Sequence, residues 1–124
     1  MPATQVALSE YLKTVYEPDP DYVDGGLEGR NVGERDHAAV QAFLSFWFKS
    51  HPEWGLALLP EMRMLVTETR VRVGDLVLVS MHEAYDDVLT RPPVAVIEIL
   101  SPEDRSYRYK PRLADYSQMG ISHI

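Results

Sequence analysis

Two short apolar runs rich in β-branched residues dominate the hydrophobic pattern of the chain. The first covers residues 74–79 and the second covers residues 94–100. Runs of this kind are typical of strands that are buried in a sheet. Each run carries one carboxylate, because Asp75 opens the first and Glu98 lies near the end of the second. An ionised group is costly in such a place unless something pairs with it. We therefore expect the chain to be organised around this acid pair.

Helical and alternating patterns predict the elements around these two runs. Apolar residues spaced three and four apart indicate helices, which capping residues begin and proline or glycine ends. Alternation of apolar and polar residues indicates strands, and Asp-Gly is a strong signal for a hairpin turn. In chain order we expect a short helix over 9–13 capped by Ser9, a hairpin over 22–28, a main helix from residue 35 or 36 to about 50, an antiparallel meander within 56–73 leading to Asp75, a polar loop over 81–89, and a helix over 111–119 ended by Gly120.

The main helix carries a wide apolar stripe. A stripe of this width favours a helix that packs across a sheet, with the stripe as part of the core. In the helix over 111–119, we expect Leu113, Tyr116 and Met119 to face inward. The members of the wide stripe are Ala39, Val40, Phe43, Leu44, Phe46, Trp47 and Phe48.

The composition is that of a single domain of 124 residues, with 45% hydrophobic and 25% charged residues. No apolar run approaches the roughly 20 residues that a membrane helix needs, and the N-terminus has no signal-peptide pattern. The absence of cysteine excludes disulfides and makes a cytoplasmic location the default. The formal net charge of −7 argues against a sequence-blind binder of phosphate backbones.

The acid pair is the strongest candidate for chemistry. Within the second run, Glu98 and Leu100 share one side of the strand because side chains alternate. The candidate metal site is Asp75 with Glu98 and Leu100. Two carboxylates and a backbone carbonyl can supply the oxygen ligands that magnesium prefers, and a water polarised by that ion can attack a phosphodiester. The alternative is that these acids are solvated or paired with a basic side chain.

Two further features are candidates for a site. A basic run, interleaved with Tyr107 and Tyr109, suits contact with a phosphate or a nucleic acid, although a solvated loop before a helix has the same pattern. His37 opens the main helix and can serve as a general base or a ligand, although a histidine there commonly bonds to the helix start. The remaining histidines have no spacing that suggests zinc. The basic run consists of Arg105, Arg108, Lys110 and Arg112.

Several motifs, spread from about Ser9 to the end of the chain, together resemble the Uma-type putative restriction endonuclease family, a bacterial branch of the PD-(D/E)XK nuclease superfamily. The most specific is Glu98-Ile99-Leu100-Ser101-Pro102. The others are Asp24-Gly25, Asp36-His37 at a helix start, Val73-Gly74-Asp75, Tyr116 and Gly120.

The resemblance implies an α/β fold with a restriction-endonuclease-like mixed sheet flanked by helices. It implies that Asp75 and Glu98 bind magnesium or manganese. Leu100 falls where the wider superfamily has its lysine, which this family carries on the following helix. Arg112 aligns with that displaced lysine, and Lys110 lies two residues before it.

Four departures from the family pattern matter. Gly74 replaces the usual proline, and Gly26 stands where the turn usually has glutamate. Arg112 keeps the positive charge of the lysine but cannot exchange a proton. Family members also continue into further strands beyond a segment like 121–124, so we expect an open sheet edge and a homodimer or other self-association.

These features predict a metal-dependent DNA endonuclease in which Asp75 and Glu98 hold the cation, Lys110 or Arg112 contacts phosphate, and His37 is peripheral. The alternative is a catalytically inactive relative that binds a partner or a nucleic acid without cutting it. A lysine directed at the acid pair would favour the enzyme. An ion pair between Arg112 and Glu98 would favour the inactive relative.

Overall fold

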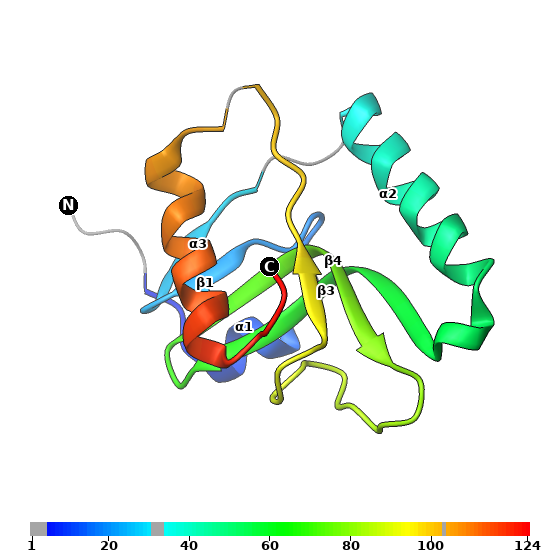
Figure 1. Ribbon diagram of the computed structural model, residues 1–124. Coiled ribbons are helices and arrows are strands. Elements are labelled where there is room, and N and C mark those ends of the chain that lie inside the picture. Colours follow the sequence, from blue (N-terminus) through cyan, green and yellow to red (C-terminus); the bar gives the residue numbers. More distant parts are fainter. Residues whose placement is uncertain (1–4, 31–33, 103) are drawn as a thin grey trace.

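The computed structural model describes residues 5–30, 34–102 and 104–124 (Figure 1). Its elements follow the predicted order of helices and strands. They are α1 (Leu8–Lys13), β1 (Asp21–Val23), β2 (Gly26–Glu28), α2 (Arg35–Lys49), the single 3-10 turn η1 (Pro52–Trp54), β3 (Leu56–Thr67), β4 (Arg70–Ser80), β5 (Ala95–Ile97) and α3 (Ser106–Met119).

The five strands form one sheet in which β4 is central. The strand order is β2-β1-β4-β3, and β5 also pairs with β4. All of these ladders are antiparallel. Two isolated bridges, Met64–Leu89 and Ala95–His123, are the parallel pairings among the described residues. The second bridge joins the segment at the end of the chain to β5.

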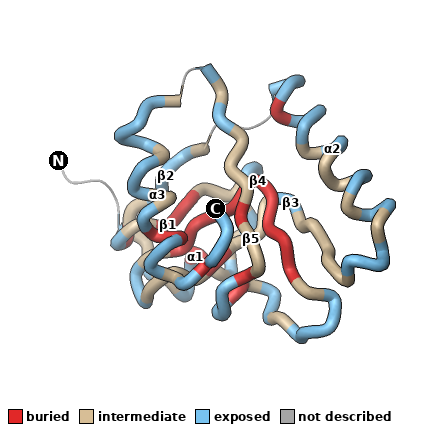
Figure 2. Tube along the Cα trace, in the orientation of Figure 1, coloured by how far each residue is buried: buried red, intermediate tan, exposed pale blue. Residues whose placement is uncertain are grey.

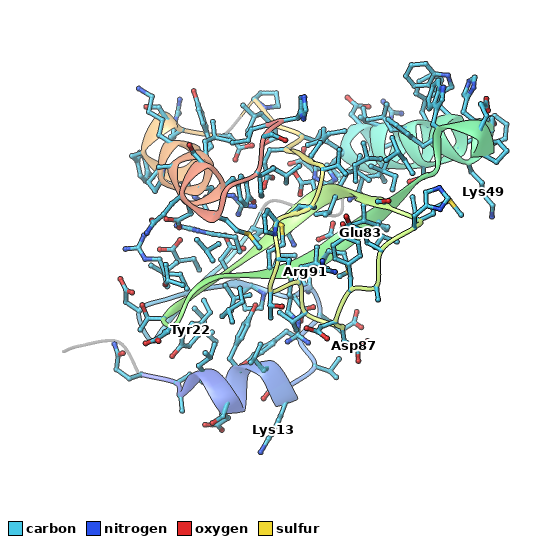
Figure 3. The ribbon with its side chains drawn as sticks, turned by 60° about the horizontal axis from the view of Figure 1, so that its bottom comes forward. Lys13, Tyr22, Lys49, Glu83, Asp87 and Arg91 are labelled. Carbon is cyan, nitrogen blue, oxygen red and sulfur yellow. The ribbon has the colours of Figure 1, made fainter. Side chains whose placement is uncertain are left out.

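The helices cover both faces of this sheet, with α1 on one side and α2 and α3 on the other (Figure 3). One apolar cluster, under α3, joins Val77 and Val96 to Tyr116. A second cluster, under α1, joins Tyr11 and Tyr22 to Val71. The predicted α/β architecture, a sheet flanked by helices, is therefore confirmed.

Side chains of β4 alternate between the two faces of the sheet, but this alternation shifts by one residue at the centre of the strand. Val71 belongs to the cluster under α1, whereas Val77, an even number of residues later, belongs to the cluster under α3. The change coincides with Glu61 in β3, whose φ of 57° is left-handed and which lies opposite Asp75 in the ladder. A local irregularity of this kind re-aims side chains, and here it occurs at the predicted site.

Several boundaries agree with the sequence, and others correct it. The hairpin is confirmed, with Asp24 and Gly25 both at positive φ as a tight two-residue turn requires. Ser9 does not cap α1, which begins at Leu8 after Ala7 without a side-chain cap. Asp75 lies in the middle of one long strand rather than at the start of a short one, because the meander and the apolar run are continuous.

The last helix begins five residues earlier than predicted, at Ser106. Proline lacks a backbone N–H and favours the first turn of a helix, yet Pro111 lies inside α3. The helix continues through it with one fewer backbone hydrogen bond. Its end at Gly120, with φ 96°, is as predicted, and Tyr116 is fully buried. The extra turn brings Tyr107 and Arg108 onto the helix.

The main helix has its predicted length but not its predicted orientation. Figure 2 shows that α2 is largely exposed. His37 is its buried residue, while Phe43, Phe46 and Trp47 are exposed. The prediction that the wide apolar stripe forms the core is therefore wrong for most of its members. Within the described residues, no helix is long and apolar enough to cross a membrane.

Candidate active site

Asp75 and Glu98 converge because β4 and β5 are paired antiparallel. Leu76 lies opposite Ile97 in this ladder. Asp75, just before Leu76, and Glu98, just after Ile97, are therefore the next pair of residues along the two segments. The backbone N–H of Ile99 donates to Asp75 Oδ2 at 2.7 Å. Asp75 is buried, the Glu98 side chain is 9% exposed, and both line the same cleft. The predicted convergence is therefore present in the structure.

The Asp75 side chain is held by groups from three other segments. Arg30 donates to Asp75 Oδ1 at 2.8 Å, and Ile99 occupies the other oxygen. His37 Nε2, at the start of α2, lies 3.2 Å from Oδ1 without the orientation of a hydrogen bond. Gln41, one turn later, donates to the backbone oxygen of Asp75 at 2.9 Å. The inner side of α2 is thus polar because it faces this site.

Glu98 is held from α3. Arg112 donates to Glu98 Oε1 at 2.8 Å, and the Tyr116 hydroxyl donates to the same oxygen. Burial raises the pKa of Glu98 to about 7; Arg112 opposes this change, while the charge of Asp75 and a hydrogen bond with it add to it. Burial alone would lower the pKa of Arg112, but Tyr116, Asp21 and Glu98 raise it overall. Glu98 therefore titrates near neutrality beside a permanent cation.

Asp21, at the start of β1, joins this site to the rest of the sheet. Its carboxylate accepts hydrogen bonds from Arg112 at 2.8 Å, from Arg72 at 3.1 Å and from the backbone N–H of Val73 at 2.9 Å. Arg30 Nε lies 4.0 Å away. The Asp21 side chain is 1% exposed, so its charge is compensated entirely by these neighbours.

A second buried pair extends the network toward the outside. Arg72 donates to Asp115 at 2.7 Å, and Arg70 reaches the same carboxylate at 3.1 Å. Arg72 also contacts Glu28, and Arg70 contacts Asp24 at the hairpin turn. Acids and arginines therefore alternate from the surface to Glu98.

The cleft above this network has a volume of about 410 Å³. Arg108 and Tyr107 lie on its wall from α3, and Arg108 donates to the Gly29 backbone oxygen at 3.1 Å. Tyr107 is exposed. Arg108 and Arg112 of the predicted basic run therefore line the cleft together with Tyr107 and Tyr109.

The structure places the sequence candidates unequally. Asp75, Glu98, Arg112 and His37 meet at the centre. The Leu100 side chain is exposed at the wall of the cleft. Lys110 on α3 and Arg105, just before that helix, are exposed and are not among the residues that line the cleft. Of the two candidate cations for phosphate contact, Arg112 is therefore the one at the acid pair.

The acid pair has donor chemistry suited to magnesium, because it offers carboxylate oxygens from two neighbouring segments of the sheet. No group of three or more acidic or histidine side chains in the described part of the chain is placed to hold a metal. The protein ligands would be Asp75, Glu98 and a backbone oxygen, with water completing the shell. Arg30 now lies against Asp75 as its counter-ion, so a bound cation would share or replace that contact.

Arg30 and Asp21 are the site residues that the sequence did not reveal. Arg30 follows the hairpin, and its partner Asp75 is 45 residues away. Asp21 is 91 residues from Arg112. In the sequence both belong to a charged segment between the first helix and the main helix, and no spacing links either to its partner. Only the Asp24-Gly25 hairpin indicates that this segment folds against the sheet.

Comparison with known proteins gives the family. The crystal structure of a putative nuclease belonging to DUF820, from Anabaena variabilis, has 20% sequence identity to this chain and a TM-score of 0.73. The match covers 90% of this chain and 67% of that chain, and it shows that the two share a fold. No curated protein matches the chain. The model of the Uma2 family, described as putative restriction endonuclease, matches residues 8–124, and the chain therefore belongs to that family.

Proposed function

We propose that this protein is a metal-dependent DNA endonuclease with its active site at Asp75 and Glu98. The observation that carries this proposal is the convergence of the two carboxylates at the base of a cleft whose wall includes Arg108 and Arg112. Membership of a nuclease family supports the reaction class, and DNA is the substrate that the family description implies.

Each residue of the site has a role in this proposal. Asp75 and Glu98 would hold a divalent cation, which when bound supplies a water polarised for attack on phosphorus. Arg112 neutralises charge on the phosphate but does not transfer a proton, because its guanidinium stays protonated. Without a cation Glu98 holds a proton at its carboxyl near pH 7, and it would release that proton to bind the cation. His37 is a peripheral residue of the site, with Nε2 3.2 Å from Asp75 Oδ1.

The wall of the cleft suits a nucleic-acid strand. Arg108 is exposed at the mouth and offers a charge to the phosphate backbone. Tyr107, beside it, offers a ring for stacking on a base. The acidic net charge of the whole chain is thus compatible with a local basic contact, because binding depends on the charge that faces the strand.

The experiment is a magnesium or manganese titration followed by thermal unfolding, together with a DNA cleavage assay. A ligand that binds only the folded state stabilises it by RT ln(1 + [L]/Kd), about 2.7 kcal/mol at 100 times Kd. We expect a rise in melting temperature and cleavage, both absent in Asp75→Asn, which keeps the size of the side chain. The exposed Asp87→Asn is the matched control and should behave as the parent. A parent with neither effect would refute the site assignment.

A second candidate function has its own observation. Arg112 pairs with Glu98 at 2.8 Å, and Arg30 pairs with Asp75 at 2.8 Å. The ion pair between Arg112 and Glu98 is the arrangement that we expected for a catalytically inactive relative. With Arg30 beside Asp75, both acids have a protein cation as counter-ion. In that case the cleft binds a nucleic acid or another partner without cutting it.

Arg112→Lys separates the two candidates. A lysine keeps one positive charge near Glu98, but its amine can exchange a proton. If the parent cuts DNA, the enzyme proposal holds and the variant should retain activity within about tenfold. If the parent is inactive and the variant gains cleavage, the protein is a nuclease relative that lacks its last catalytic group. Absence of cleavage in both, with retained DNA binding, would support the inactive module. Circular dichroism of the variant checks that it is folded.

A further inference from the structure

Helix α2 has its apolar side turned away from its own domain. The residues that face β3 and the site recur at helical spacing and are mostly polar: His37, Gln41 and Ser45, with Leu44 and Phe48. This inner side contacts the site, since Gln41 donates hydrogen bonds to the Glu61 side chain and to the Asp75 backbone oxygen. The bulky apolar residues therefore remain on the other side, the reverse of an ordinary surface helix.

The outer side forms a continuous patch, which we call the aromatic face. Its members are 40–72% exposed. Trp47 and Trp54 contact edge to face at 5.8 Å, and His51 stacks on Trp54 at 3.9 Å, so the end of the patch is already ordered. Figure 3 shows ring side chains standing away from the sheet near the end of α2 that carries Lys49. The aromatic face consists of Val40, Phe43, Phe46, Trp47 and Trp54.

The size of the aromatic face fits a dimer interface. An aromatic side chain offers about 150–250 Å², so the four partly exposed rings and Val40 present on the order of 500 Å² per copy. Two such faces together would bury on the order of 1,000 Å², which is the lower end for a specific interface between proteins. Isolated exposed apolar residues are ordinary, but a contiguous patch of this size marks an interaction site.

We propose that the aromatic face binds a second copy of this chain, with the two α2 helices antiparallel about a two-fold axis near Phe43. Residues Val40, Phe43 and Trp47 recur at three- and four-residue spacing, which is the seam of a helix pair. In this arrangement Phe43 meets its own counterpart, and Val40 lies beside Phe46 and Trp47 of the second copy.

The dipole of α2 favours this orientation, because an antiparallel pair opposes the two helix dipoles, which a parallel pair would align unfavourably. Since the inner side of α2 faces the acid pair, this interface leaves both clefts open, and the inference does not depend on the proposed function.

Sedimentation equilibrium of the whole chain from 1 to 100 µM tests the proposal. We expect a dimer for the parent and a loss of affinity on the order of 100-fold for Phe43→Glu, which buries two like charges at the axis. Val15 is the matched control, because it is an 86% exposed apolar residue outside the aromatic face, and Val15→Glu should dimerise as the parent does. A monomeric parent at 100 µM would overturn the proposal, as would a dimer that survives Phe43→Glu or is lost in Val15→Glu.

A single introduced cysteine tests the orientation and remains informative if Phe43→Glu does not fold, because the chain contains no cysteine. A two-fold axis near residue 43 places Phe43→Cys beside its counterpart, so mild oxidation should join two copies by a disulfide. Val15→Cys lies outside the aromatic face and should not form this disulfide. Absence of the disulfide in a Phe43→Cys variant that still sediments as a dimer would overturn the antiparallel pairing. Circular dichroism confirms the fold of each variant.

Discussion

At the Glu98 carboxyl, burial and neighbouring charges act on one proton in opposite directions. Burial raises its pKa, Arg112 lowers it, and Asp75 raises it further, with a result of about 7 against an ordinary value of 4.5. The guanidinium does not cancel the other effects because Arg112 is shared: its other nitrogen binds Asp21, and it also donates to the Val73 backbone oxygen. One arginine thus serves two acids.

This pKa gives the stability of the protein a defined dependence on pH. Below about pH 4.5 the Glu98 carboxyl is protonated in both states. Between pH 4.5 and 7 the unfolded chain ionises it while the folded chain keeps its proton, so the free energy of unfolding falls as the pH rises. The difference of about 2.5 between the pKa of Glu98 in the folded protein and its ordinary value corresponds to about 3 kcal/mol of unfolding free energy. We expect Glu98→Gln to lack this decrease.

Urea unfolding of the parent and of Glu98→Gln at pH 4, 6 and 8 measures the effect. The stability of the parent relative to the variant should fall by about 3 kcal/mol across this range. Glu10→Gln, at an exposed position of α1, controls for the change in net charge. A parent and variant that remain parallel at all three values would show that Glu98 is ionised normally in the folded state.

Individual site residues were predictable only where a motif marks them. Asp75 and Glu98 are visible because a lone acid interrupts each apolar run, and Arg112 is visible through the family pattern. The partners Arg30 and Asp21 lie among many exposed charges in one segment, so their burial depends on the tertiary fold. Sequence patterns report local periodicity, and these ion pairs are contacts between distant segments.

At the scale of elements, β4 is built to pass close to its neighbours at Gly74. A Cβ at this position would lie 2.7 Å from Val77 Cγ2, 3.0 Å from Val96 Cγ2 and 3.1 Å from Met64 Cε. The family's usual proline at this position is replaced here by the residue with the smallest volume. The close approach brings β5, and Glu98 directly after it, against β4 next to Asp75.

We expect Gly74→Ala to destabilise the fold by about 1–3 kcal/mol, because an added methyl group overpacks a core that has no room for it. Gly29→Ala is the matched control, since a Cβ there has no neighbour within 4 Å. Chemical denaturation of both variants measures the difference in the free energy of unfolding. Equal stabilities of the two variants would mean that Val77 and Val96 move aside at negligible cost.

The main helix shows which part of an element its sequence determines. Periodicity and the proline after it gave the bounds of α2 almost to the residue. Periodicity did not predict which side of α2 faces inward, because apolar residues cover more than half of the circumference of the helix. The orientation is set by Gln41 and His37, whose partners lie on β3 and β4. A polar site on the sheet therefore outweighs the burial of several aromatic rings.

At the scale of the whole molecule, buried ion pairs connect the first strand to the last helix. Asp21 in β1 binds Arg72 in β4 and Arg112 in α3, so one carboxylate joins elements from both ends of the chain. The order of elements and the α/β class were predictable from the patterns, since each element is local. The ion pairs that connect these elements were not predictable, because each needs two charged residues that are far apart in the sequence.

We expect Asp21→Asn to lower the free energy of unfolding by about 3–5 kcal/mol, a large part of the roughly 5–15 kcal/mol available to a domain. The amide keeps the size of the side chain and an acceptor for the Val73 N–H, but Arg72 and Arg112 lose a shared counter-ion that is 1% exposed. Asp87→Asn, at an exposed position, should change stability by less than about 0.5 kcal/mol. Urea denaturation compares the two. A loss below about 1 kcal/mol for Asp21→Asn would show that Glu98, Asp115 and Glu28 suffice to balance the buried arginines, and that the joint between β1 and α3 rests on packing rather than on charge.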